Sequence, residues 1–330
     1  MSLSKVIVTD YLEEPLKIER EILGEVAEIE ALGATNEEQL LESLAGADAL
    51  MVYHFVQITA PVIEKLEKCK IIVRYGVGVD NMDLEALKDR GIPLCNTPDY
   101  GIEEISATAV SHLLNLWRRI SSYDRACRNY REGWAQNLQK PIHRLSESTL
   151  GVIGVGRIGA ALIGLMRPFG CKILGFDPHQ PPGHEDTVGY DRVDSLTELL
   201  DVSDAISIHS VLTPETAGMV DDNFISAMKT GAILVNTARG GLFKNLDIIE
   251  EGLKSGQLGG LGTDVLPSEP PLDHPLIKSW REDAPWLQNR LVITPHTAQY
   301  SETALYDMRY LAAETVALFL KQNELRNRVI

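Results

Sequence analysis

The chain has 330 residues, of which 44% are hydrophobic, and it carries 47 acidic against 31 basic side chains. This length is enough for about two domains of ordinary size, and this composition can fill their cores. The formal net charge of -16 argues against a nucleic-acid partner, because affinity for a phosphate backbone depends on basic surface. No apolar run approaches the ~20 residues that span a bilayer, so no membrane association is expected.

The cysteines and the start of the chain indicate the compartment. Four cysteines, Cys69, Cys95, Cys127 and Cys171, are scattered, with no paired spacing and no histidine at ligand spacing. Free thiols in a reducing compartment are therefore expected, and no metal site is predicted. The N-terminus lacks the basic and apolar regions of a secretory signal. The sequence predicts a cytoplasmic protein.

In the first hundred residues, β-type runs alternate with segments of helical spacing. We expect strands at 5–10, 26–31, 49–53, 71–75 and 93–96, and helices at 13–24, 40–45, 61–69 and 84–90. This alternation predicts βαβ units on a parallel sheet. No glycine-rich turn follows the first strand, so this region is not expected to bind a dinucleotide.

The middle of the chain is expected to link two domains. Residues 102–121 predict one long helix with an apolar side, and residues 122–147 lack a clean period. We interpret 122–147 as an arm that packs on something else, such as another subunit. The alternation then resumes, with glycines such as Gly259 and Gly260 expected in turns. Expected strands are 150–155, 171–176, 205–209, 232–235, 261–265 and 291–293, and expected helices are 160–166, 196–200, 224–228, 246–255 and 301–321.

A glycine-rich turn lies between the strand and the helix that open this second half. Gly154, Gly156 and Gly159 have the G-x-G-x-x-G spacing, and Asp177 ends the following strand. The glycines permit a tight turn, close approach of a pyrophosphate and close packing of helix on strand, while the helix N-terminus attracts phosphate. Asp177 can accept hydrogen bonds from ribose hydroxyls and would repel a 2′-phosphate, so NAD is favoured over NADP. The alternative is a structural turn in an unrelated α/β domain.

Four reactive side chains follow later strands. They are Arg239, the acids Asp264 and Glu269, and His296. Ligands bind at the carboxyl ends of parallel strands, so a base, a carboxylate partner and a cation at this edge suit redox chemistry on a hydroxy acid. Each also has a plain structural reading: a surface ion pair for Arg239, a loop brace for Asp264, a turn for Glu269-Pro-Pro and a satisfied loop residue for His296.

These motifs resemble the D-isomer-specific 2-hydroxyacid dehydrogenases from end to end. The branch that looks closest is the C-terminal-binding-protein-like and phosphoglycerate-dehydrogenase-like one, through Tyr53-His54, Ile72–Asn81, Asn96–Glu104, Asn236–Leu242 and Thr294–Glu302. The resemblance implies two doubly wound parallel-sheet α/β domains. A Rossmann NAD-binding domain of residues 102–299 would be inserted into a flavodoxin-like substrate-binding domain of residues 1–101 and 300–330. It also implies a homodimer formed by the arm at 122–147.

The resemblance implies a role for each reactive residue. His296 would be the acid/base, Glu269 would orient its imidazole, and Arg239 would hold the substrate carboxylate and polarise its carbonyl. The implied cofactor is NAD, and its contacts would be Gly154, Gly156, Arg157, Ile158, Gly159, Asp177, Thr237, Ala238, Asp264 and Ala298. The implied substrate contacts are His54, Arg74, Val77, Gly78, Arg239 and Gln299.

One position departs from the family. Many members of the branch carry an aromatic residue where this chain has Gln299. An amide there favours a substrate with a polar or anionic group beyond C2, whereas the alternative is that Gln299 only fills space.

Three functions are compatible with these patterns. The first is an NAD-dependent oxidoreductase that interconverts a 2-oxo acid and a D-2-hydroxy acid. The second is an NAD(H)-sensing, corepressor-like interaction module, and the third is a structural NAD-binding subunit. The complete set of Arg239, Glu269 and His296 favours catalysis, because a pure sensor needs no acid/base.

Overall fold

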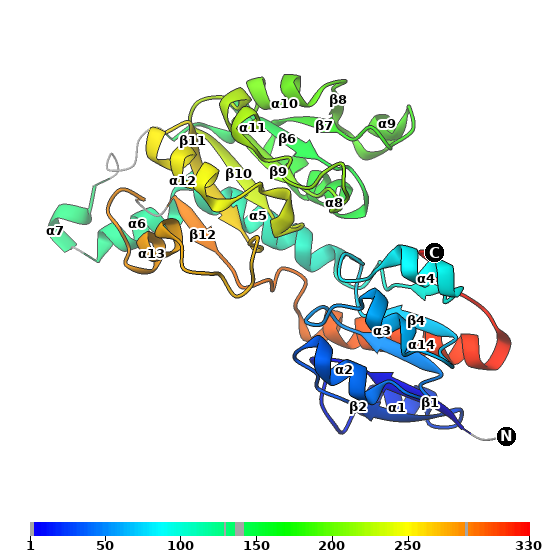
Figure 1. Ribbon diagram of the computed structural model, residues 1–330. Coiled ribbons are helices and arrows are strands. Elements are labelled where there is room, and N and C mark those ends of the chain that lie inside the picture. Colours follow the sequence, from blue (N-terminus) through cyan, green and yellow to red (C-terminus); the bar gives the residue numbers. More distant parts are fainter. Residues whose placement is uncertain (1–2, 129, 136–141, 288–289) are drawn as a thin grey trace. The chain divides into compact units, whose positions relative to one another are not determined.

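The computed structural model describes residues 3–128, 130–135, 142–287 and 290–330. They form two compact units, which we call unit 1 (residues 1–101 and 300–330) and unit 2 (residues 102–299). Each unit is an α/β fold built on one all-parallel sheet (Figure 1), which confirms the predicted fold class. None of the helices in the described ranges is long and apolar enough to cross a membrane.

Unit 1 has a five-stranded sheet with the order β2-β1-β3-β4-β5, which is the flavodoxin-like order. The strands are β1 (Ser4–Val8), β2 (Ala27–Ala31), β3 (Ala49–Val52), β4 (Ile71–Arg74) and β5 (Leu94–Cys95). Side chains alternate between the faces, so that Val6 and Met51 enter one core while Ile7 and Leu50 enter the other. Both faces of this sheet are therefore apolar, as a buried parallel sheet requires.

Helices cover both faces of the unit 1 sheet. The first core is closed by α1 (Lys17–Leu23) and α14 (Glu302–Gln322), and the second by α2 (Glu37–Ser43), α3 (Ala60–Glu64) and α4 (Leu84–Arg90). Figure 1 shows the orange-red α14 beside the blue strands, although it is the last helix of the chain. A buried ion pair joins it to α1, since Arg309 Nε lies 2.8 Å from the fully buried Glu19 Oε1.

Unit 2 has a seven-stranded sheet with the order β12-β11-β10-β9-β6-β7-β8. From β8 inwards this is the Rossmann order, and β12 adds a seventh strand at the far edge. The strands are β6 (Thr149–Ile153), β7 (Lys172–Phe176), β8 (Asp191–Arg192), β9 (Ala205–Ile208), β10 (Ala232–Asn236), β11 (Leu258–Thr263) and β12 (Leu291–Ile293). The expected strands of this half are thus all present, with β11 beginning three residues early.

The faces of the unit 2 sheet again carry separate cores. Helices α5 (Ile102–Arg118) and α8 (Arg157–Met166) pack on one face. The other face is covered by α10 (Leu196–Val202), α11 (Asp222–Ala227), α12 (Leu246–Ser255) and α13 (Pro275–Arg281). The sequence-based assignment missed α9 (His184–Val188), β8 and α13, which are short and flanked by turn residues.

The long helix expected at 102–121 is wrong in its second part. Arg119 adopts a left-handed conformation with φ of 55°, which ends α5 at Arg118 and starts α6 (Ile120–Cys127). The Asn115 side chain stabilises this corner, because its oxygen accepts hydrogen bonds from the backbone N–H and the hydroxyl of Ser121 at 2.9 Å. Helix α6 and α7 (Tyr130–Gly133) therefore make the start of the expected irregular arm helical, and residues 129 and 136–141 lie outside the described residues.

Two glycines expected in turns lie inside β11 instead. A Cβ on Gly259 would collide with the carbonyl of Gly231, and one on Gly260 would come within 3.3 Å of Leu116. They are there because neighbouring chain segments approach the strand closely.

Candidate active site

The residues expected to act in unit 2 lie at one edge of its sheet. All seven strands are parallel, so their carboxyl ends meet there. Gly154 follows β6, Asp177 follows β7, Thr237 follows β10, Asp264 follows β11, and His296 lies three residues after β12. The strand order reverses between β6 and β9, and this switch point is where doubly wound sheets bind their ligands.

The glycine turn has the geometry that its spacing predicts. Gly154 has φ of 83°, and a Cβ there would lie 2.7 Å from the backbone nitrogen of Ser210. A Cβ on Gly159 would collide with the carbonyl oxygen of Gly154, so only glycine lets α8 pack this close to β6. Nothing lies within 4 Å of the Cβ position of Gly156. The turn is therefore closely packed at Gly154 and Gly159 and open at Gly156, as a phosphate-binding turn must be.

Asp177 connects the end of β7 to this turn. Its Oδ2 accepts a hydrogen bond from the backbone N–H of Val155 at 2.8 Å, and its Oδ1 accepts one from His179 at 3.0 Å. The carboxylate is half-buried and fixed beside the turn. A fixed carboxylate at this place can accept hydrogen bonds from ribose hydroxyls and repels a phosphate.

The loop after β10 is fixed by the buried side chain of Asn236. Its Nδ2 donates to the carbonyl of Arg239, and its Oδ1 accepts from the N–H of Ala238, both at 2.9 Å. The hydroxyl of Thr237 is buried and has no hydrogen-bond partner in the described structure. A buried hydroxyl without a protein partner marks a position where a ligand can supply one. Together with the open glycine turn, this orphaned hydroxyl fits a dinucleotide.

His296 and Glu269 form a hydrogen-bonded pair. The distance between His296 Nδ1 and Glu269 Oε2 is 2.6 Å, and the other carboxylate oxygen accepts the backbone N–H of Leu266 at 2.8 Å. His296 is half-buried and has φ of 55°, which is uncommon for a residue other than glycine. Two residues from segments far apart in the sequence thus meet in the orientation that an acid/base pair needs.

Asp264 braces the loop that carries His296. Its carboxylate accepts the hydroxyl of Thr294 at 2.5 Å and the backbone N–H groups of Thr297 at 3.0 Å and Ala298 at 2.8 Å. The structure therefore supports the structural reading of Asp264. Its cofactor contact remains a prediction, for which about one acceptor position of the carboxylate is left. Gln299 also serves this loop, because its amide donates to the carbonyl of His296 at 3.1 Å.

In unit 1, the expected substrate residues lie at or just after the ends of β3 and β4. Arg74 is the buried last residue of β4, and its guanidinium carbon lies 5.9 Å from the centre of the Tyr53 ring. The turn that follows β4 is fixed by a hydrogen bond, since the side-chain amide of Asn96 donates to the carbonyl of Val77 at 2.8 Å. Val77, Gly78 and His54 are half-buried, and the His54 ring lies 4.5 Å from that of Tyr53.

His209 is a residue of this edge that the sequence-based analysis missed. It follows β9 at the switch point, next to the glycine turn, and its Nε2 lies 2.9 Å from the hydroxyl of Ser207. Burial lowers the pKa of His209 to about 4, so the ring is neutral at physiological pH. The strand expected at 205–209 includes His209, so the rule of a reactive side chain just after a strand did not select it. The observed β9 ends at Ile208, which places His209 after the strand.

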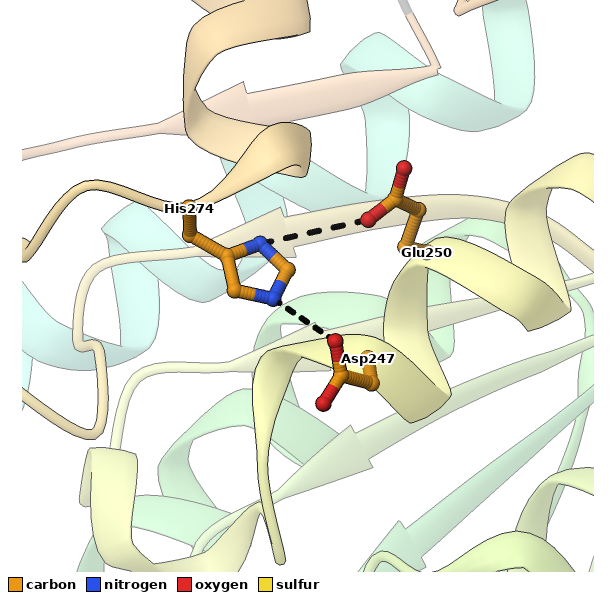
Figure 2. A group of neighbouring side chains, drawn as sticks. All are labelled: Asp247, Glu250 and His274. Carbon is orange, nitrogen blue, oxygen red and sulfur yellow. Dashed lines mark hydrogen bonds and ion pairs between the residues drawn. The ribbon is translucent and has the colours of Figure 1, made fainter.

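A second histidine–carboxylate group lies on α12 and α13 (Figure 2). Asp247, Glu250 and His274 are the one set of His, Cys, Asp or Glu side chains in the described ranges that is close enough to hold a metal ion. Figure 2 shows the two carboxylates facing different ring nitrogens, with Nε2 lying 3.0 Å from Asp247 and Nδ1 lying 4.0 Å from Glu250. Nδ1 also accepts the N–H of Leu276, and Glu250 pairs with Lys254. Capping and ion pairing account for this group without a metal.

Comparisons with known proteins place the chain in a family. Residues 110–298 match the model of the D-isomer specific 2-hydroxyacid dehydrogenase, NAD binding domain. The chain is 36% identical over 327 residues to D-3-phosphoglycerate dehydrogenase of Methanocaldococcus jannaschii, which covers 99% of this chain and 59% of that protein. The chain thus spans less than two thirds of the length of this relative.

Solved structures agree over the whole chain. The TT0316 protein from Thermus thermophilus is 33% identical with a TM-score of 0.84, covering 99% of this chain and 100% of the other. D-lactate dehydrogenase from Aquifex aeolicus, complexed with NAD and lactic acid, is 28% identical with a TM-score of 0.82, covering 96% and 95%. The chain belongs to the D-isomer-specific 2-hydroxyacid dehydrogenase family, and its unit 2 contains the NAD-binding domain of that family.

Proposed function

We propose that this chain is an NAD-dependent oxidoreductase that interconverts a 2-oxo acid and a D-2-hydroxy acid. The observation that carries the proposal is the pair of His296 and Glu269, with 2.6 Å between Nδ1 and Oε2. This pair lies on the same sheet edge as the glycine turn and the Arg239 loop. An acid/base on a dinucleotide-binding edge is what a dehydrogenase requires.

The proton chemistry is assigned to His296. NAD supplies or accepts the hydride when it is bound. During reduction, the Nε2–H of His296 gives its proton to the 2-oxo oxygen, and during oxidation Nε2 takes that proton back. Glu269 holds the Nδ1–H, which fixes the ring orientation and stabilises the imidazolium that forms in the oxidation direction.

Substrate binding is assigned to Arg239 and to backbone groups of unit 1. The planar guanidinium of Arg239 suits a carboxylate held by two parallel hydrogen bonds, and its charge polarises the neighbouring carbonyl. The contribution proposed for unit 1 is substrate binding by the backbone N–H groups of Val77 and Gly78. Their turn is already fixed by Asn96, so little ordering would be needed on binding.

Cofactor binding is assigned to the residues around the switch point. The backbone of Arg157 and Ile158, at the start of α8, holds the pyrophosphate, and Asp177 holds the ribose. The loops after β10, β11 and β12 line the nicotinamide. The residues proposed for this pocket are Gly154, Gly156, Gly159, Thr237, Ala238, Asp264 and Ala298.

We propose further that the substrate carries a polar or anionic group beyond C2. Gln299, His54 and Arg74 are the residues that would contact it, and Arg74 supplies the positive charge for an anionic group. The relative named D-3-phosphoglycerate dehydrogenase is consistent with such a substrate. Steady-state kinetics with 2-oxo acids of graded polarity test this idea, and the highest kcat/KM with an apolar side chain would contradict it.

We also propose that the protein is a cytoplasmic homodimer. Its four cysteines are free, as in a reducing compartment. The start of the arm exposes Tyr130 by 75% and Trp134 by 72%, and large aromatic side chains are enriched in protein interfaces. Light scattering on wild type and on Trp134→Ser tests the dimer, which should weaken in the variant. A monomeric wild type would contradict it.

A screen of NADH oxidation with a library of 2-oxo acids tests the activity itself. We expect turnover with at least one acid and NADH binding in its absence. NADH binding without turnover of any acid would instead favour the corepressor-like sensing module.

A further inference from the structure

Helix α5 contains a buried histidine that the proposed mechanism does not use. His112 is 5% exposed and lies against β11, so close that a Cβ on Gly262 would come within 2.8 Å of the His112 Cβ. A histidine in an apolar helix is usually a core residue with locally satisfied nitrogens. Here its Nε2 lies 3.3 Å from the hydroxyl of Thr294, two residues before His296.

The direction of these hydrogen bonds follows from the chemistry of the groups. The Thr294 hydroxyl has one proton, and it donates this proton to the carboxylate of Asp264 at 2.5 Å. It must therefore accept from His112, whose Nε2 carries the proton. Burial lowers the pKa of His112, which favours the neutral ring, and the hydrogen bond to the Thr294 hydroxyl selects the tautomer with the proton on Nε2. The result is a directed chain from His112 through Thr294 to Asp264.

The same face of α5 reaches the loop at a second point. Thr108 is one turn before His112, and its hydroxyl donates to the carbonyl of Ala298 at 3.4 Å. The carboxylate of Asp264 accepts hydrogen bonds from the backbone N–H groups of Thr297 and Ala298. The backbone carbonyl of Asp264 accepts a hydrogen bond from the N–H of His296 at 2.8 Å. Both ends of the 294–298 loop are thereby bonded to α5 or to Asp264, the residue that follows β11.

The loop needs such ties because its central residue is strained. His296 has φ of 55°, and a non-glycine residue stays in this conformation only where its surroundings enforce it. The same backbone conformation directs the imidazole to Glu269. Hydrogen bonds that fix the flanking residues therefore also fix the distance and angle of the acid/base pair.

We propose that His112, with Thr108 beside it, is a positioning residue that holds the His296 loop through Thr294 and Asp264. The proposal rests on the proposed function for its kinetic consequence. Its structural consequence, an ordered loop at 294–298, can be measured without any turnover.

The first test compares His112→Leu with His112→Gln and with Ser111→Ala. Leucine keeps the apolar packing and removes the N–H, whereas glutamine restores an N–H donor at similar reach. Ser111 is the matched control, because it is exposed on the same helix and its hydroxyl bonds only to the carbonyl of Ala107 within α5. Thr294→Val and Thr294→Ser repeat the comparison at the next link, in case His112→Leu does not fold.

The kinetic readout separates positioning from stability. In folded His112→Leu and Thr294→Val we expect kcat to fall on the order of 10- to 100-fold, because small misplacements of reacting groups cost this much. NADH affinity should change much less than kcat, because the glycine turn and Asp177 are untouched. The pH at which activity is half-maximal should move, and the Gln and Ser variants should recover activity. The double variant should lose no more than the larger single loss. An unchanged kcat and pH profile in folded His112→Leu would overturn the proposal.

Hydrogen exchange supplies the readout that does not depend on activity. The amides of Thr297 and Ala298 should exchange faster in His112→Leu and Thr294→Val than in wild type or Ser111→Ala. If wild type reduces no 2-oxo acid but these amides respond, the proposed function fails and the positioning role stands. If the amides exchange at the wild-type rate in both variants, the positioning role is wrong whatever the activity.

Discussion

In the described residues of unit 2, His296 and His274 each lie within hydrogen-bond distance of a carboxylate, but in different settings. His296 lies 2.6 Å from Glu269, and His274 lies 3.0 Å from Asp247. His274 is the N-cap of α13, and its Nδ1 accepts the backbone N–H of Leu276. In that pair both ring nitrogens complete the fold. In the His296 pair the carboxylate holds Nδ1, and the strained loop at the carboxyl edge of the sheet places the ring.

The difference shows that a carboxylate next to a histidine does not by itself indicate catalysis. Two features of the setting decide the role. One is whether backbone groups bond to the ring nitrogens, and the other is whether the ring lies at the ligand-binding edge of the sheet. His274 stabilises a helix start on the flank of the sheet, whereas His296 is held by a strained φ and a buried brace, Asp264.

The largest effect is expected on replacing the two histidines. His296→Ala should lower kcat by on the order of 10²- to 10⁴-fold, because it removes the general acid/base, and should leave NADH binding intact. His274→Ala should keep kcat near wild type. Steady-state kinetics with parallel NADH fluorescence titrations check both. Equal losses in the two variants would mean that the two histidines do not differ in their role in catalysis.

Replacing the carboxylate partners should also affect kcat at Glu269 and not at Asp247. Glu269→Gln keeps the shape and removes the charge that holds the Nδ1–H, so kcat should fall by about tenfold or more. Asp247→Asn alters a carboxylate that is 71% exposed and should leave kcat unchanged. The kinetics of the two variants, measured at several pH values, decide this. Full activity in Glu269→Gln would mean that the pair does not orient the acid/base.

His209 extends the contrast to a histidine without a carboxylate. Its folded-state pKa of about 4 lies below the unfolded value of 6.5, so the unfolded chain binds the extra proton first. Stability that is present above pH 6.5 should therefore be lost as the pH falls towards 4, by on the order of 3 kcal/mol from this residue. The free energy of unfolding should depend less on pH between pH 4 and 8 in His209→Asn than in wild type. The same pH dependence in both proteins would refute this assignment.

The smallest effect concerns the cap itself. His274→Ala should lower the free energy of unfolding by about 1 kcal/mol, and His274→Asn, which restores a good cap, should recover most of it. Chemical denaturation of the three proteins measures this difference. A stability loss in His274→Ala that asparagine does not repair would mean that the ion pair with Asp247, and not the cap, stabilises α13.

Much of this picture could be predicted because parallel sheets place residues by a simple rule. Apolar runs predict the strands. A residue just after a parallel strand must lie at the carboxyl edge of the sheet, so Gly154, Arg239 and His296 are predicted to lie at the same edge. The glycine turn was predictable for a similar reason, since its conformation depends on which residues lack a Cβ. The family resemblance supplied the pairing of His296 with Glu269.

Other features depend on tertiary contacts that no local pattern records. The break at Arg119 is stabilised by hydrogen bonds from Ser121 to the Asn115 side chain, and a helical period cannot show it. His112 has the apolar spacing of a core position, so its polar link to Thr294 appears only once α5 lies on β11. Gly259 resembles a turn glycine because close approach of another segment and a tight turn both require the same residue.

The activity proposed for this chain is the reduction of a 2-oxo acid to the D-2-hydroxy acid with NADH as the reductant. Incubation with limiting NADH and the best acid of the screen, followed by chiral chromatography, measures amount and configuration together. We predict one hydroxy acid for each NADH consumed, all of it the D-enantiomer, and an initial rate of product formation on the order of 10²- to 10⁴-fold lower with His296→Ala. Formation of the L-enantiomer, or the same initial rate with His296→Ala, would contradict the proposed activity.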